Sequence, residues 1–578
     1  MGRLVYRRRI IHDHFLTVAV GLALSGLGTA RADGPTSGES LRAVLEGELD
    51  VSMNGLATED GTRPYFLAYS VYDEHTAVVA ATLGALAQDQ RQHERNLNIE
   101  LRVGDYALDN THVLRQGGVE RARGSGNLPI ALDDDPESIR HTLWLHTDRT
   151  FKRAVKRFEQ IRTNLRVKVE EEDASGDFSR EAPQLFDEPP ATLTFDQPAW
   201  QRRMKRVSAL AREHPLVHES AVIVGAYAGT RTLVSSEGTR LRTASTRYRI
   251  TLTAATTAAD GMRLEQTHTF NAAQENRLPD DGTIERAFGQ VIEQVLALRE
   301  APLAEPYIGP AILRNRASGV FFHEIFGHRI EGHRQKDVSE GQTFTKKIGE
   351  PVLPEFLDVY DDPSLARFGD EDLRGHYLFD DEGVKAIRAL LVDKGVLKSF
   401  LLSRNPVEGF PKSNGHGRCQ PGNAVAARQA NLVVESARQV SFTELREMLL
   451  EECRGQGKPY GLLFEDISGG FTMTGRRGPQ SFKVLPIVVY RVFPDGRPDE
   501  LIRGVDLVGT PLTCFEKILA TADDPAVFNG SCGAESGWVP VSAVSPSILV
   551  KTIEVEKRTR EQDRPPILPP PFGLEPPS

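Results

Sequence analysis

Apolar residues recur every three or four positions in four stretches of the first half of the chain, and this spacing predicts amphipathic helices. The first helix begins after Ser40, a residue that favours the start of a helix. The other three are predicted over Glu137 to Glu171, Ala199 to Glu213 and Ile284 to Leu298. Pro302 stops the last helix, and we place a domain boundary there.

Between these helices, runs of β-branched and aromatic residues predict strands. The predicted strands are Tyr65 to Val71, Ala77 to Val79, Asn98 to Val103, Val222 to Ala228, Thr232 to Glu237 and Thr246 to Ala254. The last three, separated by Gly and Ser, are typical of an antiparallel meander. Ala174 to Pro190 is polar, contains three prolines and is predicted to be a long loop. Residues 41–302 are therefore predicted to form an α/β domain with long helices and a mixed sheet.

Residues 303–555 contain shorter strand and turn signals and are predicted to form a β-rich domain. Asp393-Lys394-Gly395 lies between two apolar runs and predicts a hairpin. Further elements are a helix over Phe442 to Cys453 and strands over Phe482 to Phe493 and Ser542 to Glu554. The fold class is thus α+β, an α/β domain followed by a β-rich domain. Residues 556–578 are rich in proline and are predicted to be an extended or disordered tail.

The N-terminus has the three-part layout of a secretory signal peptide. Several arginines precede an apolar run from Phe15 to Leu27, and Ala30-Arg31-Ala32 supplies a small-x-small cleavage site. We therefore expect residues 1–32 to be removed, residues 33–40 to form a flexible lead-in, and the mature protein to be exported, either periplasmic or secreted. An uncut membrane anchor is the alternative, but the apolar run is too short to span a bilayer.

Charge and cysteine content narrow the function further. The formal net charge is −10, and removing five Arg and one Asp with the signal peptide makes it −14, because −10 − 5 + 1 = −14. An acidic exported protein is a poor candidate for binding nucleic acid or anionic lipid. Only four cysteines are present, so the chain is not a disulfide-rich scaffold.

The strongest chemical signal is the pattern H-E-x-x-x-H formed by His323, Glu324 and His328 inside an apolar run. Two imidazoles beside a carboxylate suit a catalytic zinc site, in which the metal lowers the pKa of bound water to about 7 and a carboxylate accepts its proton. On an ideal helix, residues five apart lie roughly 140° apart around the axis. We therefore predict that the helix is distorted, by a π-bulge or by a break near Gly327.

A third protein ligand is needed, and two residues are candidates. Cys532 stands between Gly530 and Gly533 in a predicted tight turn, where glycines let the backbone bring a thiolate close to a metal. By itself, a small cysteine in such a turn is typical of a buried structural residue. His333 continues the spacing of five and is the alternative ligand. Glu331 is a candidate for orienting a ligand imidazole.

Four segments together resemble the TldD/PmbA family of zinc metallopeptidases, and specifically its TldD-like members. They are Gly319 to Gly332, Phe379 to Gly383, Ile467 to Phe471, and Cys532-Gly533 followed by Val539-Pro540-Val541. The resemblance implies that His323, His328 and Cys532 bind Zn²⁺ and that Glu324 is the general base. It also implies dimers that enclose a cleft for unfolded peptides, formed by two copies or with a related subunit lacking the metal motif.

Several features of the sequence differ from the family pattern or allow other functions. Cys419 replaces a more usual basic position of the family, and the signal peptide moves the chain out of the cytoplasm, where familiar members work. A glycine turn follows the three carboxylates Asp380, Asp381 and Glu382, which are expected to be solvated. His416 is a further possible metal contact. The alternatives to a metallopeptidase are a catalytically silent, peptide-binding partner and a zinc hydrolase of a non-peptide amide.

Overall fold

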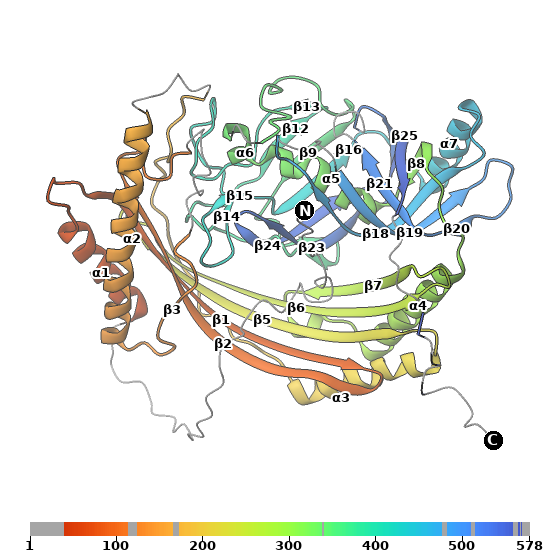
Figure 1. Ribbon diagram of the computed structural model, residues 1–578, viewed down its shortest axis with the longest axis horizontal. Helices are drawn as coiled ribbons and strands as arrows, with labels where there is room; N and C mark the ends of the chain where they lie inside the picture. Colours follow the sequence, from red (N-terminus) through yellow and green to blue (C-terminus); the bar gives the residue numbers. More distant parts are fainter. Residues whose placement is uncertain are drawn as a thin grey trace, which may run out of the picture.

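The computed structural model describes residues 40–113, 124–165, 173–337, 340–476, 482–509 and 515–558, with four positions beyond them, 565, 566, 568 and 571. The predicted signal peptide, most of the lead-in and most of the proline-rich tail lie outside the described residues, as does Cys514. A long curved sheet from the first half of the chain lies beneath a second body built from the later residues (Figure 1).

The four helices predicted in the first half are confirmed. They are α1 (Leu41–Gly55), α2 (Pro136–Leu165), α3 (Gln197–Ala209) and α4 (Asp281–Glu300). The Ser40 side chain accepts a hydrogen bond from the backbone N–H of Ala43, which is the contact expected of a residue capping a helix N-terminus. Asp196 and Asp280 cap α3 and α4 in the same way.

The strands of the first half form one seven-stranded mixed sheet in the order β3-β2-β1-β5-β6-β4, with β7 paired to β6. Their bounds are β1 Pro64–Thr82, β2 Ala85–Val103, β3 Leu128–Pro129, β4 Leu185–Asp187, β5 Glu219–Ser235, β6 Arg240–Thr257 and β7 Arg263–Ala272. An antiparallel meander is present, but it consists of β5, β6 and β7 rather than of the three predicted strands, because the first two of those lie in the single strand β5.

The predicted strands were too short. Two of them merge into β1, two merge into β5, and Asn98 to Val103 is only the last part of β2. Residues 85–95 of β2 pair with β1 although they are mostly exposed and polar. A strand with solvent on most sides carries no apolar alternation, which is why the sequence pattern does not reveal it.

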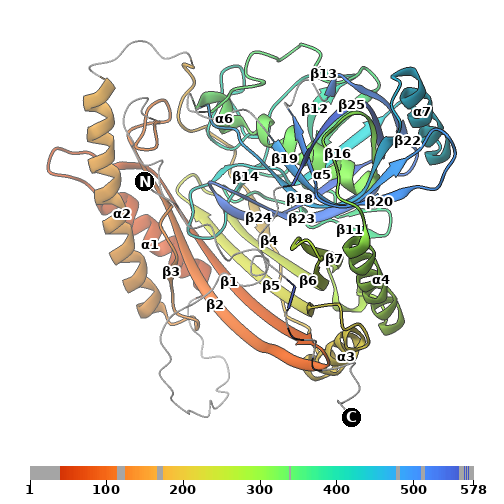
Figure 2. The ribbon, with the colours of Figure 1, turned by 45° about the vertical axis from the view of Figure 1, so that its right-hand side comes forward.

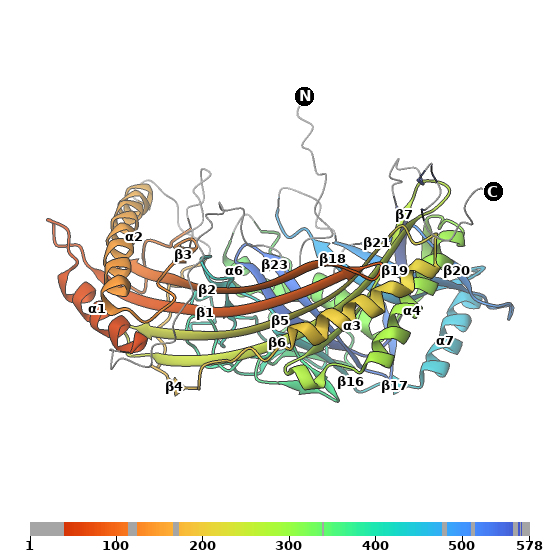
Figure 3. The ribbon, with the colours of Figure 1, turned by 90° about the horizontal axis from the view of Figure 1, so that it is seen from below.

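Two groups of helices cover the outer face of this sheet, one at each end (Figure 3). Val44 and Leu45 of α1 and Leu143 of α2 pack on Leu67, Tyr69 and Val71 of β1. Residues of α3 and α4 pack on the other end, against Val79 and the apolar positions of β5 and β6. The inner face of the sheet turns toward the second body, where Arg231 of β5 bonds Asp381.

The second half contains one six-stranded and one eight-stranded sheet, which confirms its β-rich character. The six-stranded sheet, in the order β13-β12-β9-β16-β24-β23, has the bounds β9 Leu357–Asp361, β12 Ala389–Asp393, β13 Val396–Leu397, β16 Asn431–Ser436, β23 Ala526–Ala534 and β24 Gly537–Ser545. Two-residue strands pair separately, as β10 Arg367–Phe368 with β11 Glu371–Asp372 and β14 Gly417–Arg418 with β15 Ala426–Ala427.

The eight-stranded sheet partly closes on itself. Its strands are β8 Tyr307–Leu313, β17 Gln439–Val440, β18 Gly461–Thr472, β19 Phe482–Val492, β20 Glu500–Ile502, β21 Val505–Gly509, β22 Ile518–Ala522 and β25 Ile548–Lys557. Because β8 pairs with both β18 and β25, five strands form a closed ring. Helix α7 (Phe442–Gly455) packs outside it, as Figure 2 shows.

Two sequence predictions in this half have clear outcomes. The hairpin at Asp393 is confirmed, with Lys394 and Gly395 both at positive φ, as a two-residue turn requires. The single strand predicted over Ser542 to Glu554 is wrong, because the chain leaves β24 at Ser545 and enters β25 at Ile548, with Pro546 between them. Within the described part of the chain, no helix combines the length and apolarity needed to cross a membrane.

Candidate metal centre

The helix that carries the H-E-x-x-x-H pattern is broken, as its spacing predicts. Helix α5 (Asn315–Ile325) gives way to a 3-10 turn, η3 (Gly327–Ile330), and then to α6 (Gly332–Lys336). A Cβ atom at Gly327 would overlap the side-chain amide of Gln429, which would then have to move. Arg329 donates to the backbone carbonyls of Glu324 and Ile325, which the break leaves without helical partners.

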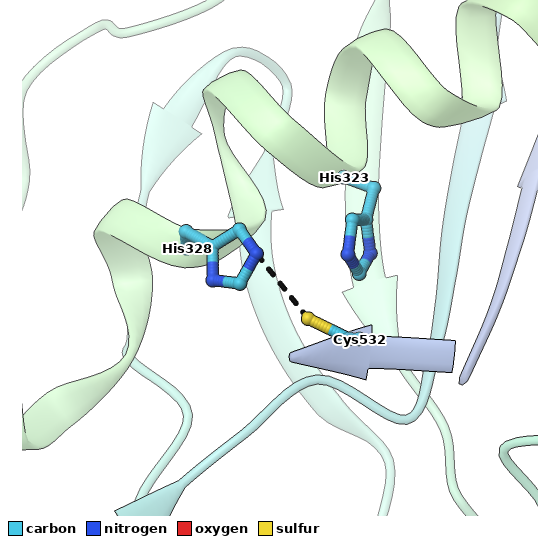
Figure 4. A group of neighbouring side chains, drawn as sticks. All are labelled: His323, His328 and Cys532. Atoms are coloured by element: carbon cyan, nitrogen blue, oxygen red, sulfur yellow. Dashed lines mark hydrogen bonds between the residues drawn. The ribbon is translucent and has the colours of Figure 1, made fainter. Parts of the chain in front are cut away.

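The break brings His323 and His328 together, and Cys532 reaches them from β23 (Figure 4). The imidazole centroids of the two histidines are 5.1 Å apart, and Cys532 Sγ lies 3.3 Å from His328 Nε2. One nitrogen of each histidine and the sulfur all lie within 4.8 Å of one another, and all three residues are buried. Side chains separated by about two hundred positions therefore converge on one point.

Cys532 does not occupy the predicted turn, and that prediction is wrong. It lies within β23 and pairs with Val539 of β24, while the turn itself follows, at Glu535 and Ser536. The neighbouring glycines are needed for packing instead, because the Phe528 ring covers Gly530 and the Trp538 ring covers Gly533. The strand points the Cys532 side chain to the face on which α5 packs.

The three donors fit a zinc ion. Zn–S and Zn–N bonds of about 2.3 and 2.0–2.1 Å at a tetrahedral angle place sulfur and nitrogen ~3.6 Å apart. The observed separation of 3.3 Å between Cys532 Sγ and His328 Nε2 is close to this value. Two imidazoles and one thiolate also leave a fourth position for water or substrate, which is the arrangement of catalytic zinc sites.

The carboxylate of Glu324 lies beside the donors. Its Oε2 is 3.9 Å from His328 Nε2, and the residue is only 8% exposed. Burial raises the pKa of Glu324, and the two neighbouring histidines partly offset that rise. The carboxyl group is thus held where it can exchange a proton with a group bound at the fourth position.

A network of buried charged residues holds the candidate ligands in position. Glu331 is fully buried, with one of its oxygens 3.4 Å from His328 Nδ1 and the other accepting a 2.8 Å bond from Arg334. Burial alone would raise the pKa of Glu331, but His328 and Arg334 bring it down to about 2. Glu331 therefore stays ionised and can orient the His328 ring, the role predicted for it.

Arg428 is the supporting residue that the sequence did not reveal. It is fully buried, donates a 2.8 Å hydrogen bond to the backbone carbonyl of Cys532, and lies 3.4 Å from Glu331. It therefore ties the cysteine strand to the carboxylate that orients His328. In the sequence, Arg428 is simply an arginine before Gln429 in the Ala427 to Ala430 segment. Nothing in that local pattern indicates that it connects the Cys532 strand to Glu331.

Charge in the centre is balanced within the cluster. Burial opposes ionisation of Cys532, but His328, His323 and Arg428 together hold the pKa of its thiol well below the usual range. Burial likewise opposes protonation of His328, whereas the Cys532 thiolate and Glu331 raise its pKa. The sulfur is therefore held as a thiolate, which is the form that binds metals.

The alternative metal contacts lie elsewhere. His333 pairs with Glu535 rather than joining the donor group of His323 and His328. His416 is fully buried and bonds Asn414 and Asp361. His416 is thus engaged in structural contacts, whereas His333 belongs with Glu331 and Glu535 to a separate group of possible metal donors.

The expectation that Asp380, Asp381 and Glu382 are solvated is wrong. Asp380 is 1% exposed, and its carboxylate accepts hydrogen bonds from the backbone N–H groups of Val384 and Gly417. Burial raises the pKa of Asp380 to about 7 and that of Glu382 well above its ordinary value. Asp381 and Glu382 are partly buried, and Asp381 bonds Arg231 of the sheet of the first half.

A cavity of about 590 Å³ opens between the two halves of the molecule, beside the metal centre rather than at it. Its lining includes residues of α2, β2 and α6, together with His333 and Glu535. Glu535 follows Cys532 by three residues and bonds Arg334, so the cavity wall and the ligand network share side chains.

This fold and this centre define an α+β protein with a buried group of two histidines and one cysteine that could hold a metal ion. Residues 307–557 match the model of the PmbA/TldA metallopeptidase C-terminal domain. The second half of the chain therefore matches a domain of the TldD/PmbA type, as its sequence motifs predict.

Similar proteins carry names consistent with this. A protein of Archaeoglobus fulgidus named metalloprotease is 31% identical over 281 residues, covering 47% of this chain and 58% of its own length. The zinc metalloprotease TldD homolog of Saccharolobus solfataricus is 26% identical over 251 residues, covering 43% of this chain and 51% of its own length. The chain thus spans only half to three fifths of these relatives in alignment.

The crystal structure of TldE from Thermococcus kodakarensis superposes with a TM-score of 0.60 at 15% identity, covering 89% of this chain and all of that one. At this identity the likeness shows the fold alone. It extends over both halves of the molecule, including the first half, for which the sequence motifs gave only a general resemblance.

Proposed function

We propose that the protein is an exported zinc metallopeptidase that hydrolyses peptide bonds in unfolded or extended chains. The observation that carries this proposal is the convergence of His323, His328 and Cys532, with the Glu324 carboxylate 3.9 Å from a ligand nitrogen. The names of the relatives support the same class of activity.

The residues of the centre divide the chemistry between them. A zinc ion bound by His323, His328 and Cys532 would polarise the scissile carbonyl and lower the pKa of its water to about 7. Glu324 is placed to act as the general base, and would take up a proton at its carboxylate and pass it to the leaving amine. Glu331 and Arg428 hold the His328 ring and the Cys532 strand in place, which keeps both ligands oriented throughout the reaction.

The substrate is proposed to bind as an extended strand. β23, which carries Cys532, is an edge strand of its sheet. Gly533 of this strand is exposed next to the metal ligand. Main-chain pairing gives affinity without demanding one sequence, which suits unfolded substrates. The family resemblance further supports a dimer, of two copies or with a related subunit, that encloses the site.

Export is part of the proposal and rests on the sequence of residues 1–32. The arginine-rich start, the apolar run and Ala30-Arg31-Ala32 support removal of a signal peptide. Analysis of the N-terminus of the protein recovered from the outside of the producing cell tests this point. A chain that begins at Met1 there would contradict it.

The activity is tested by removing and restoring the metal. The purified protein is stripped with a chelator, its zinc content is measured, and cleavage of a permanently unfolded protein is followed with and without added Zn²⁺. We expect cleavage to disappear with the metal and to return with zinc. A protein that binds zinc but does not cleave peptides in either state would favour the silent binding partner, and cleavage that survives stripping would reject the metal mechanism.

A further inference from the structure

A second group of metal-ligating side chains lies in the sheet of the first half, far from the His323 centre. His75 of β1 and His93 of β2 are directly opposite each other in the antiparallel pair. Asp73 precedes His75 by two residues, so its side chain lies on the same face of the strand. Cross-strand neighbours on one face have Cβ atoms about 4.5–5.5 Å apart, close enough to share an ion.

The donor atoms converge. Asp73 Oδ1 lies 2.8 Å from His93 Nε2 and 3.6 Å from His75 Nε2. The two imidazole rings are stacked, with centroids 4.0 Å apart and planes 15° from parallel, so both present the same edge to the carboxylate. Zinc bonds of about 2.0–2.2 Å at a tetrahedral angle place such donors ~3.3 Å apart. The two observed separations lie on either side of this value.

Arg95 holds the carboxylate in position. It donates to Asp73 Oδ2 from Nε at 2.8 Å and from Nη2 at 2.5 Å, which leaves Oδ1 directed at the histidines. Arg95 also bonds Asp134 at 2.8 Å, so its positive charge is compensated by a second carboxylate.

The group is open to solvent. It lies on the outer face of the sheet, because Leu67 to Val71 on one side of it pack under α1 and α2 and Ala77 to Val79 on the other side pack under α3. Figure 3 shows this middle part of β1 and β2 between the two sets of helices. The side chains of His75 and His93 are 43% and 33% exposed, so an ion can reach them.

We infer that Asp73, His75 and His93 form a second metal site, which takes a divalent transition-metal ion such as Zn²⁺. Two imidazoles and one carboxylate are the donors that such ions prefer, and the remaining coordination positions face water. The site links the two longest strands of the protein at the point where β2 becomes polar and exposed. Since a polar strand specifies its own register weakly, a bound ion here fixes the pairing of β1 with β2.

Metal counting tests this inference. Chelator-stripped protein is dialysed against Zn²⁺ alone, and the zinc bound per chain is measured for wild type and for the double variant His75→Ala, His93→Ala. We expect the double variant to bind one zinc ion fewer per chain. His141→Ala is the matched control, because His141 is an exposed histidine of α2 outside both groups, and it should bind as much zinc as wild type.

The two sites are distinguished by their donors. Cobalt bound at the His323 centre gives a thiolate charge-transfer band, whereas cobalt bound by Asp73, His75 and His93 gives none. We expect the double variant to keep this band and Cys532→Ala to lose it while retaining the zinc ion of the second site. Far-UV circular dichroism checks folding, and His93→Gln replaces the double variant if that protein does not fold. Equal zinc content in wild type and the variant lacking these histidines would overturn the inference.

Discussion

Two buried clusters of ionisable side chains lie in the second half of the molecule, and they use their donor atoms differently. In the His323 centre, an imidazole and a thiolate face one another at 3.3 Å, with no backbone group between them. In the Asp380 cluster, the backbone N–H groups of Val384 and Gly417 donate hydrogen bonds to the carboxylate oxygens of Asp380. Donors that converge on each other suit a metal ion, whereas donors that are satisfied by the backbone hold a loop in place.

The charged residues of the two clusters also differ in how their charge is balanced. Glu331 contacts His328, Arg428 bonds the Cys532 backbone, and both are balanced by opposite charges, which holds the pKa of Glu331 low. Asp380 and Glu382 are carboxyl groups whose burial raises their pKa values, which favours the protonated form near neutral pH. Changes in the first cluster should therefore alter chemistry, and changes in the second should alter the dependence of stability on pH.

The largest effect is expected for Glu324→Gln. Glutamine keeps the shape of the side chain but cannot accept a proton, so turnover should fall by about 10²- to 10⁴-fold, the usual contribution of a general base. Zinc content should stay at the wild-type value, since Glu324 is not a ligand. Parallel measurements of zinc and of cleavage of an unfolded protein check both points. Undiminished cleavage in this variant would remove Glu324 from the mechanism.

Cys532→Ala should weaken zinc binding by more than about 100-fold, because removing a ligand costs more than the 10- to 100-fold typical of removing a residue that only orients one. Competition with a chelator of known affinity measures the change. The control is Cys453→Ala, which removes a buried thiol from the apolar cluster around α7 and should leave zinc binding unchanged. If Cys532→Ala retains wild-type affinity, the sulfur is not a ligand.

The sequence was sufficient to predict that His323, His328 and Cys532 lie together, but not what surrounds them. The spacing of His323 and His328 required a break, and the structure has that break at Gly327. Glycines around Cys532 suggested a turn, yet they lie in a strand, where the rings of Phe528 and Trp538 pack over them. Arg428 is recognisable only when the chain is folded, since its partners lie about one hundred positions away.

The fold was predictable in class and in its helices, but the strand lengths were not. Local periodicity reports a surface with one apolar side, so it finds α1 to α4 and the apolar parts of β1, β5 and β6. It gives no strand signal for residues 85–95 of β2, which pair through the backbone while most of their side chains are exposed to water. It also misjudged Asp380, because the carboxylate of this buried residue is bonded by backbone groups that include Gly417, which no local pattern connects to it.

Glu331→Gln should have a smaller effect than loss of a ligand, about 10- to 100-fold in metal affinity or turnover. The variant removes the negative charge that faces His328, Arg334 and Arg428, so the ring is less well oriented and two buried guanidinium groups lose their shared partner. Metal affinity and the apparent melting temperature should both decrease. Glu535→Gln is a useful comparison, because it keeps Glu331 and changes only the outer end of the network. Equal metal affinity in both variants would show that Glu331 does not orient the ligand.

The smallest effect is expected for Asp380→Asn and appears only when pH is varied. The pKa of Asp380 is about 7 in the folded protein, above its ordinary value of 3.8, so the folded state holds more protons than the unfolded state between these limits. This carboxyl group therefore favours folding at low pH, and its contribution is lost as pH rises through about 7. We expect the wild type to melt roughly 2–4 °C lower at pH 8 than at pH 5 on account of this group, given the usual relation between stability and melting temperature. Asparagine does not titrate, so the melting temperature of Asp380→Asn should depend less on pH, even though this variant is less stable at every pH. Asp370→Asn, at an exposed position, should keep the wild-type dependence on pH. If Asp380→Asn and wild type show the same dependence on pH, the carboxyl group is ionised in the folded protein and the contrast with the metal centre no longer holds.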